Sequence, residues 1–240
     1  MEIATDALRL DDQKGKGQAE INLLGIATRA DGSVGARFSD TLKLDRESQP
    51  ELDKLKQPPL HYEKEFKIVP GQYDFVLTFG QSAASFGRIQ MPLYVEPWPR
   101  EELSLSSIVL SRETHAAADL GLVSSLLDRT PLVAQGMQFV PFGSNQFTRS
   151  DEGFFYIQLY DPDPGRVTLR VRVLDRNSGE PRWDSGVTKL PIASGETQLS
   201  IPAAASLRLG SLGTGSYRLE VAATSSTGAE IHRTADFEIK

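Results

Sequence analysis

The sequence predicts an all-β protein built from two tandem immunoglobulin-like or fibronectin III-like antiparallel β-sandwiches. Three observations support this fold class: strand-like segments recur with turn residues between them, helical periodicity is nearly missing, and one plan of strands and turns occurs twice. Of the 240 residues, 39% are hydrophobic, so each half has enough apolar material to bury a core.

The first half contains five segments that are rich in β-branched and aromatic residues. We predict strands at 19–28, 34–44, 60–69, 73–79 and 86–95. Turn residues separate these strands. Ala30-Asp31-Gly32-Ser33 predicts a hairpin, and Pro70-Gly71-Gln72 predicts a tight reversal whose glycine can adopt a positive φ.

The clearest strands of the second half are 154–160, 166–174, 217–223 and 230–239. Apolar and polar residues alternate from Val167 to Val173, which is typical of a sheet with one face in water. Residues 112–130 fit either a short amphipathic helix, which Gly121 disfavours, or a loop packed across the second sandwich.

The segment Glu96-Pro97-Trp98-Pro99-Arg100 predicts the domain boundary, because its two prolines remove backbone donors and stiffen the chain. Residues 1–98 contain seven lysines and five arginines, whereas residues 99–240 contain two lysines and twelve arginines. We therefore predict a first sandwich over 1–97 and a second over 98–240, with an N-terminal extension of the second at about 100–150.

The two halves repeat a local motif. Gly71-Gln72-Tyr73 and Gly215-Ser216-Tyr217 each precede alternating apolar residues, a turn of small residues and a last strand. A tyrosine at this place resembles the tyrosine corner of immunoglobulin-like sandwiches, in which the hydroxyl bonds back to the backbone. Two ordinary core tyrosines are the alternative.

Charge and composition exclude several classes of function. The net charge is −6 and the chain has no basic run, so nucleic-acid binding is not expected. The absence of cysteine excludes disulfides, thiolate metal sites and a cysteine nucleophile. The sequence has no run of about 18 apolar residues, so membrane insertion is not expected. The N-terminal MEIATDALRL lacks the pattern of a secretion signal.

The metal-ligating residue types are scattered. His61, His115 and His232 share no ligand spacing, so we predict no metal site from them. Asp161 and Asp163, in Asp161-Pro162-Asp163-Pro164-Gly165, could contribute two oxygens to a calcium site. Calcium requires about six to eight oxygens, and the same residues are typical of an ordinary turn.

No pattern of catalytic residues is present. Gly80-Gln81-Ser82-Ala83-Ala84 lacks the last glycine of a nucleophile elbow and the strand-to-helix context that the elbow requires. The adjacent carboxylates Glu101-Glu102 and Asp151-Glu152 have no reason to develop separated pKa values. We therefore predict no enzyme, no catalytic residue, no cofactor and no metal.

Aromatic residues suggest one alternative function. Trp98, Trp183 and the cluster Phe154-Phe155-Tyr156 could stack against sugar rings, which is typical of carbohydrate-binding modules. Core packing is the alternative for the cluster, because its members alternate along one strand.

Several segments resemble a known family. The runs Leu24-Gly25-Ile26-Ala27, Pro70-Gly71-Gln72-Tyr73 and Phe155-Tyr156-Ile157-Gln158, with diffuse matches from about residue 18 to 240, resemble the C-terminal region of bacterial, mainly acidobacterial, von Willebrand factor A-related proteins. The resemblance implies an extracytoplasmic protein and no enzymatic activity for this region. Asp31-Gly32-Ser33 is the nearest match to the D-x-S-x-S adhesion motif and lacks its second serine, so no adhesion residue is transferred.

Together these observations predict a non-catalytic tandem β-sandwich module. It would act as a spacer or as a protein-interaction region of an extracytoplasmic bacterial protein, binding partners through an edge strand or through loops. The alternative is a carbohydrate-binding module, with polysaccharide as a less favoured partner than protein.

Overall fold

The computed structural model describes residues 1–3, 11–13, 16–46, 60–82, 85–99, 101–117, 130–161, 166–189 and 200–240. These residues form two compact units, Met1–Trp98 and Pro99–Lys240, whose junction lies one residue from the boundary predicted above. The sheets are almost entirely antiparallel, and no α-helix occurs in the described ranges. The all-β prediction is therefore confirmed.

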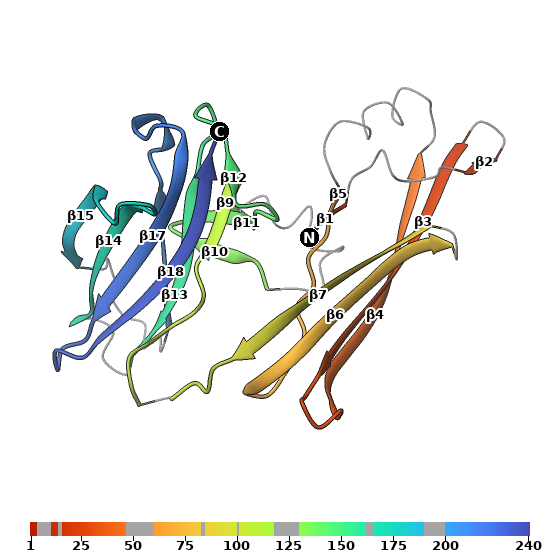
Figure 1. Cartoon of the computed structure of the whole chain (residues 1–240), viewed down its shortest axis with the longest axis horizontal. Helices are drawn as coiled ribbons and strands as arrows, with labels where there is room; N and C mark the ends of the chain where they lie inside the picture. The colour runs from red at the N-terminus through yellow and green to blue at the C-terminus, as the bar shows by residue number, and fades with distance from the viewer. Residues whose placement is uncertain are drawn as a thin grey trace. The chain divides into compact units, whose positions relative to one another are not determined.

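One antiparallel sheet dominates the first unit, with the strand order β4-β3-β6-β7 (Figure 1). Its strands are β3 (Lys16–Thr28), β4 (Val34–Arg46), β6 (Gly71–Ser82) and β7 (Ser85–Val95), and β2 (Asp11–Gln13) pairs with the start of β3. The predicted hairpin joins β3 to β4, with Gly32 at φ 83° and the Asp31 carboxylate accepting a hydrogen bond from the Ser33 amide at 2.9 Å.

A small second layer covers one face of this sheet. It contains β1 (Glu2–Ile3) and β5 (Leu60–His61), which pair with each other. Ile3 and Tyr62 are buried with Ile21, Leu23 and Leu77 of the large sheet. This first unit is thus a sandwich of two unequal layers.

The predicted strand over 60–69 is wrong beyond residue 61. Residues 62–69 belong to no strand, although Tyr62 exchanges two backbone hydrogen bonds with Met1 at 2.8 Å. Their alternating pattern comes from packing on the large sheet: the Phe66 ring lies 5.3 Å from the Phe38 ring and 5.8 Å from the Phe75 ring. Because burial on one side produces the same period-two pattern as strand pairing, sequence alone could not separate them.

Two sheets of similar size form the second unit. One has the order β10-β11-β9-β13-β16 with β8 also on β13, and the other has the order β12-β18-β17-β14-β15. The first sheet comprises β8 (Ser104–Leu105), β9 (Val109–Ala116), β10 (Leu132–Ala134), β11 (Met137–Pro141), β13 (Phe154–Tyr160) and β16 (Ser200–Ser206). The second comprises β12 (Gln146–Phe147), β14 (Thr168–Asp175), β15 (Pro181–Lys189), β17 (Gly215–Thr224) and β18 (Glu230–Ile239).

The core of the second unit lies between these sheets. Phe155 and Ile157 of β13 are buried in one cluster with Val171 of β14 and Leu219 of β17. The helix considered for 112–130 is wrong at its start, because Val109–Ala116 is strand β9, paired with β11 and β13. Residues 118–129 lie outside the described ranges.

The internal repeat is visible in the strand order. The arrangement β4-β3-β6-β7 of the first unit recurs as β15-β14-β17-β18 in the second. The Tyr73 hydroxyl donates to the carbonyl oxygen of Val69 at 2.7 Å, and the Tyr217 hydroxyl donates to that of Gly213 at 2.9 Å. Both rings are buried. The tyrosine-corner prediction is therefore confirmed in both units.

Candidate functional site

Strand alternation gives the large sheet of the first unit an inner face, which packs on the second layer, and an outer face. On β3, Leu23 is buried while the adjacent Leu24 is exposed. Leu24 lies opposite Ser39 of β4 and Thr78 of β6, so these side chains share one face. The term outer face is used below for the side of the sheet that carries Leu24, Ile26, Val76, Thr78, Phe86 and Tyr94.

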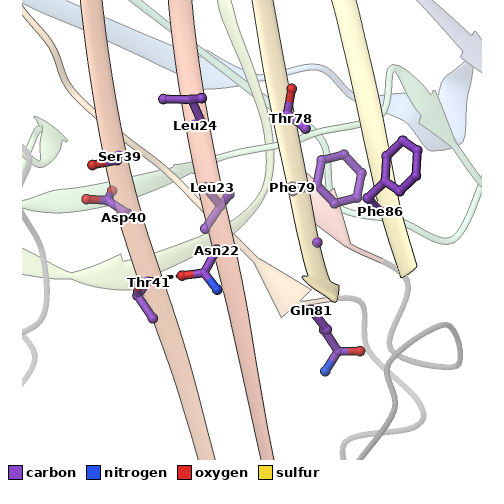
Figure 2. A pocket seen from close by; sticks show the side chains of 11 residues that line it. Asn22, Leu23, Leu24, Ser39, Asp40, Thr41, Thr78, Phe79, Gln81 and Phe86 are labelled. Atoms are coloured by element: carbon purple, nitrogen blue, oxygen red, sulfur yellow. Dashed lines mark hydrogen bonds between the residues drawn. The ribbon is translucent and has the colours of Figure 1, made fainter. Parts of the chain in front are cut away.

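Large apolar side chains are exposed on this outer face. The exposed fractions are 44% for Leu24, 60% for Tyr94 and 72% for Phe86. A depression of about 650 Å³ lies over β3, β4, β6 and β7, and its lining includes Leu24, Thr78 and Phe86. Figure 2 shows these three side chains on neighbouring strands, with Ser39 and Thr41 on β4 beyond them.

Polar side chains around the depression bond to one another. The Thr41 hydroxyl donates to the Asn22 side-chain oxygen at 2.8 Å. On the same face, the Gln90 amide donates to the Asp74 carboxylate at 2.7 Å. Arg88 donates to the Gln90 side-chain oxygen, and Arg37 lies opposite Ile26. The depression therefore offers an apolar surface around Leu24 and Phe86 with a polar and charged rim. Such a surface is typical of binding and not of catalysis.

The matching face of the second unit is covered by ion pairs. When Tyr73 is aligned with Tyr217, the cross-strand pair Ile26–Val76 occupies the position of Arg172–Glu220. Arg172 and Glu220 form a charge-assisted hydrogen bond across β14 and β17. The two repeats therefore differ at this pair of positions: Ile26–Val76 is apolar in the first unit, where Arg37 lies opposite Ile26, and Arg172–Glu220 is an ion pair in the second.

Further ion pairs continue across the second unit. Arg218 binds Asp236 at 2.7 Å, and Arg170 binds Asp184 through two nitrogens. Hydrogen bonds from the Arg170 guanidinium, followed by one from the Gly186 amide, lower the pKa of Asp184 to about 2. Arg170, Arg172 and Arg218 are thus each paired with a carboxylate of a neighbouring strand.

Each of the three histidines lies beside a glutamate two residues away on its own segment. The distances are 2.7 Å for His61–Glu63, 2.9 Å for His115–Glu113 and 3.0 Å for His232–Glu230. The structure does not bring the histidines together. Over the described part of the chain, no three His, Cys, Asp or Glu residues are grouped closely enough to hold a metal ion.

The calcium candidates are only partly described. Asp161 is buried, with 6% of its surface exposed, and it lines a depression together with Glu101, Glu102 and Glu230. Asp163 lies outside the described residues. The prediction about calcium at Asp161 and Asp163 therefore stays open.

The remaining chemical candidates lie in ordinary surroundings. Ser82 ends β6 of a β6–β7 antiparallel pair, so the strand-to-helix context of a nucleophile elbow is absent at this position. Asp151 accepts a hydrogen bond from the Thr148 amide in a turn. Glu101 and Glu102 are exposed.

The aromatic cluster does not form a sugar platform. Phe155 and Tyr156 are both buried, in two different clusters on opposite faces of β13. Tyr156 packs 5.9 Å from the Phe139 ring, and burial raises its pKa. Trp183 is half-buried against the core of the second unit, and Trp98 ends the first unit. The platform interpretation is therefore wrong for Phe155 and Tyr156.

Sequence reasoning missed the outer face. The signal that could have revealed it is the pair Leu23-Leu24, where two adjacent apolar residues interrupt the alternation of a strand. Phe86 at the start of β7 adds to the same signal. Single exposed apolar residues are ordinary, but several that gather in one patch mark a surface that another molecule can cover.

Comparisons with known proteins add little to the geometry. No family model and no curated protein matches the chain. Among solved structures, a β-glucuronidase of Parabacteroides merdae aligns with a TM-score of 0.32 and 10% identity over 99% of this chain and 30% of that one. A Bacteroides uniformis β-glucuronidase 2, covalently bound to cyclophellitol-6-carboxylate aziridine, aligns with a TM-score of 0.29 and 11% identity over 98% and 27%. The chain spans under a third of either enzyme, and at this similarity neither informs its activity.

In the described ranges, no helix has the length and hydropathy needed to cross a bilayer.

Proposed function

We propose that the chain is a non-catalytic β-sandwich module that binds another protein through the outer face of its first unit. The observation that carries this proposal is the contrast between the two repeats. The same face bears the ion pair Arg172–Glu220 in one unit and Ile26–Val76, with exposed Leu24 and Phe86, in the other. The second unit folds with an ion pair on this face of its sheet, so the shared strand order does not itself require exposed apolar residues at the matching positions of the first unit.

Protein is the favoured partner because of the chemistry of this face. Its apolar area with a polar rim of Asn22, Ser39 and Thr41 matches the anatomy of protein interfaces. Carbohydrate recognition generally combines a flat aromatic platform with several directed hydrogen bonds, and the hydroxyl of Thr41 is already bonded to Asn22. A spacer role for the second unit, whose charged face is internally paired, is compatible with this division.

The proposal includes an extracytoplasmic location in a bacterium. It is supported by the resemblance of segments such as Pro70-Gly71-Gln72-Tyr73 to the C-terminal region of von Willebrand factor A-related proteins. Protease accessibility of the full-length natural product in intact cells tests this location, with a cytosolic protein as the protected control.

The binding function can be tested by site-specific photo-crosslinking in the cells that make the protein. A photoreactive phenylalanine analogue replaces Phe86, and the matched control carries it at Glu230, which occupies the aligned position of β18. Both positions are exposed. We expect a discrete crosslinked polypeptide from position 86 only, and loss of that product when Leu24→Ser is added.

Two outcomes overturn the proposal. Equal crosslinking from the two positions would show that the outer face of the first unit is not special. Retention of the parent protein on a polysaccharide matrix, with loss of retention in Phe86→Ser and no protein crosslink, would assign the same face to carbohydrate.

A further inference from the structure

The two repeats can be compared residue by residue at the end of their last strands. Tyr73 pairs with Leu93 as Tyr217 pairs with Phe237, and two residues away Val95 matches Ile239. β7 and β18 therefore correspond in register. The outer edge of each strand, meaning the edge that faces away from its hairpin partner β6 or β17, can be compared directly with that of the other.

In the second unit this edge is covered by a short parallel strand. β12 pairs with β18, with Gln146 beside Glu238 and Phe147 beside Ile239. The Glu238 amide donates to the Asn145 carbonyl at 2.8 Å, and the Lys240 amide donates to the Phe147 carbonyl at 2.9 Å.

The side chain of Phe147 completes the core at this edge. It is fully buried and meets the Phe237 ring edge-on at 5.9 Å. Phe237 and Ile239 are accordingly 1% and 3% exposed. A strand with only two paired residues is thus held largely by one aromatic anchor.

The first unit has no equivalent of β12 in its described ranges, where β7 is the last strand of its sheet. Leu93 and Val95, which match Phe237 and Ile239, are only partly buried. Met91 is 48% exposed and Tyr94 is 60% exposed on the same strand. The core is therefore less covered at this edge than at the matching edge of the second unit.

The backbone of β7 is also suited to the same pairing. Tyr94 occupies the position of Glu238, so its amide points toward the outer edge, as the Glu238 amide does toward β12. Pro92, two residues earlier, has no amide hydrogen, which limits a ladder to the carboxyl end of β7. This is the same short stretch that β12 occupies on β18.

We infer that the carboxyl end of the β7 edge binds an extended segment of a partner protein, parallel to β7, with a bulky apolar side chain beside Val95. This inference adds a second contact to the proposed protein-binding function and depends on that function: Leu93 and Val95 lie on the inner phase of β7, whereas Phe86 and Tyr94 lie on its outer phase. Main-chain hydrogen bonds to β7 provide pairing, and the apolar side chain over Leu93 provides selectivity, as in other cases of strand addition. The β12 segment shows the chemistry of such an occupant.

Disulfide trapping can test this inference cleanly, because the chain contains no cysteine. The probe is a synthetic peptide that copies residues 143–149, Gly-Ser-Asn-Gln-Phe-Thr-Arg, with Gln146→Cys. The full chain carries Tyr94→Cys, which the parallel register places beside the peptide cysteine. In the matched control, Glu238→Cys lies on the edge that β12 already covers.

We expect Tyr94→Cys to capture the peptide about tenfold more than Glu238→Cys at equilibrium in a thiol buffer, and Phe147→Ala in the peptide to remove most of that advantage. Tyr94 is exposed, so the substitution leaves the fold intact. Equal capture at the two positions, indifference to the peptide phenylalanine, or a disulfide-linked dimer of Tyr94→Cys in place of the peptide adduct would each overturn the inference.

This result is distinguishable from the test of the function itself. A crosslinked partner from position 86 together with failed trapping at position 94 leaves the protein-binding function standing and removes the edge as its site. Failure of both removes the function as well.

Discussion

Replacing Tyr217 with phenylalanine removes one hydroxyl group and leaves the ring packed on Phe237, whose centroid lies 5.6 Å away. The lost bond is the donation from the hydroxyl to the Gly213 carbonyl at 2.9 Å. The Tyr217 ring is buried, with 5% of its surface exposed, whereas Gly213 is exposed, so water can reach the carbonyl that loses its donor. We therefore expect the loss of one net hydrogen bond, about 1 kcal/mol of unfolding free energy.

The same substitution at Tyr73 has a different expected cost. The Tyr73 hydroxyl donates to Val69 at 2.7 Å and also accepts a hydrogen bond from the Arg29 guanidinium at 3.2 Å. Tyr73→Phe therefore removes two bonds, and we expect it to cost at least as much as Tyr217→Phe, about 1–3 kcal/mol.

Urea unfolding followed by tryptophan fluorescence measures both effects separately. Trp98 lies in the first unit and Trp183 in the second, so Trp183→Phe and Trp98→Phe backgrounds each report one unit. The free energies are taken from midpoint shifts at constant slope. Tyr94→Phe is the control, since this tyrosine is 60% exposed. If both corner variants unfolded at the midpoint of their background while the control behaved likewise, the hydroxyl bonds would contribute nothing to stability, and the argument would be refuted.

Three further predictions concern packing and charge. Gly25→Ala places a methyl group 2.3 Å from the Phe38 ring, so we expect the first unit to lose about 1–3 kcal/mol in urea unfolding, and an unchanged midpoint would show that the ring yields freely. Phe147→Ala removes a fully buried ring and should cost the second unit about 3–5 kcal/mol, whereas a loss below about 1 kcal/mol would mean that β12 does not anchor this edge. Because the pKa of Asp184 is lowered from 3.8 to about 2 in the folded protein, its stabilising contribution is present above the first value and is lost as the pH falls through the second. Asp184→Asn should therefore reduce the pH dependence of the thermal unfolding midpoint of the second unit across this acidic range. An unaltered pH dependence would contradict the ion pair with Arg170.

Sequence patterns located most strands because period-two alternation is a local property of a chain with one buried face. Strand β18 occupies the predicted range 230–239, and β13 occupies 154–160. The same reasoning failed over 62–69, which belongs to no strand although its Phe66 ring packs on Phe38 and Phe75 of the large sheet. It also failed at 112–116, where alanine and charged residues mask the part of β9 that pairs with β11.

The candidate site was harder to predict than the fold. The aromatic residues that attracted notice in the sequence, Phe155 and Tyr156, are core residues on opposite faces of one strand. Leu24 and Phe86 are exposed, and the adjacent apolar pair Leu23-Leu24 shows in the sequence only that one of the two residues faces water. Which phase of a strand faces water depends on the layer that covers the sheet, and that layer is formed by segments far away in sequence.

By itself, the sequence determined the all-β class, the duplicated turn-and-tyrosine motif and the proline-stiffened junction, because each of these depends on residues that are neighbours along the chain. Only the tertiary structure decided that the corresponding sheets of the two units differ, with ion pairs such as Arg172–Glu220 on one and exposed apolar residues on the other. It also decided that Phe147 of β12 covers the edge of β18. These features arise where strands distant in sequence meet, since cross-strand register sets both the neighbours of a side chain and its contact with water.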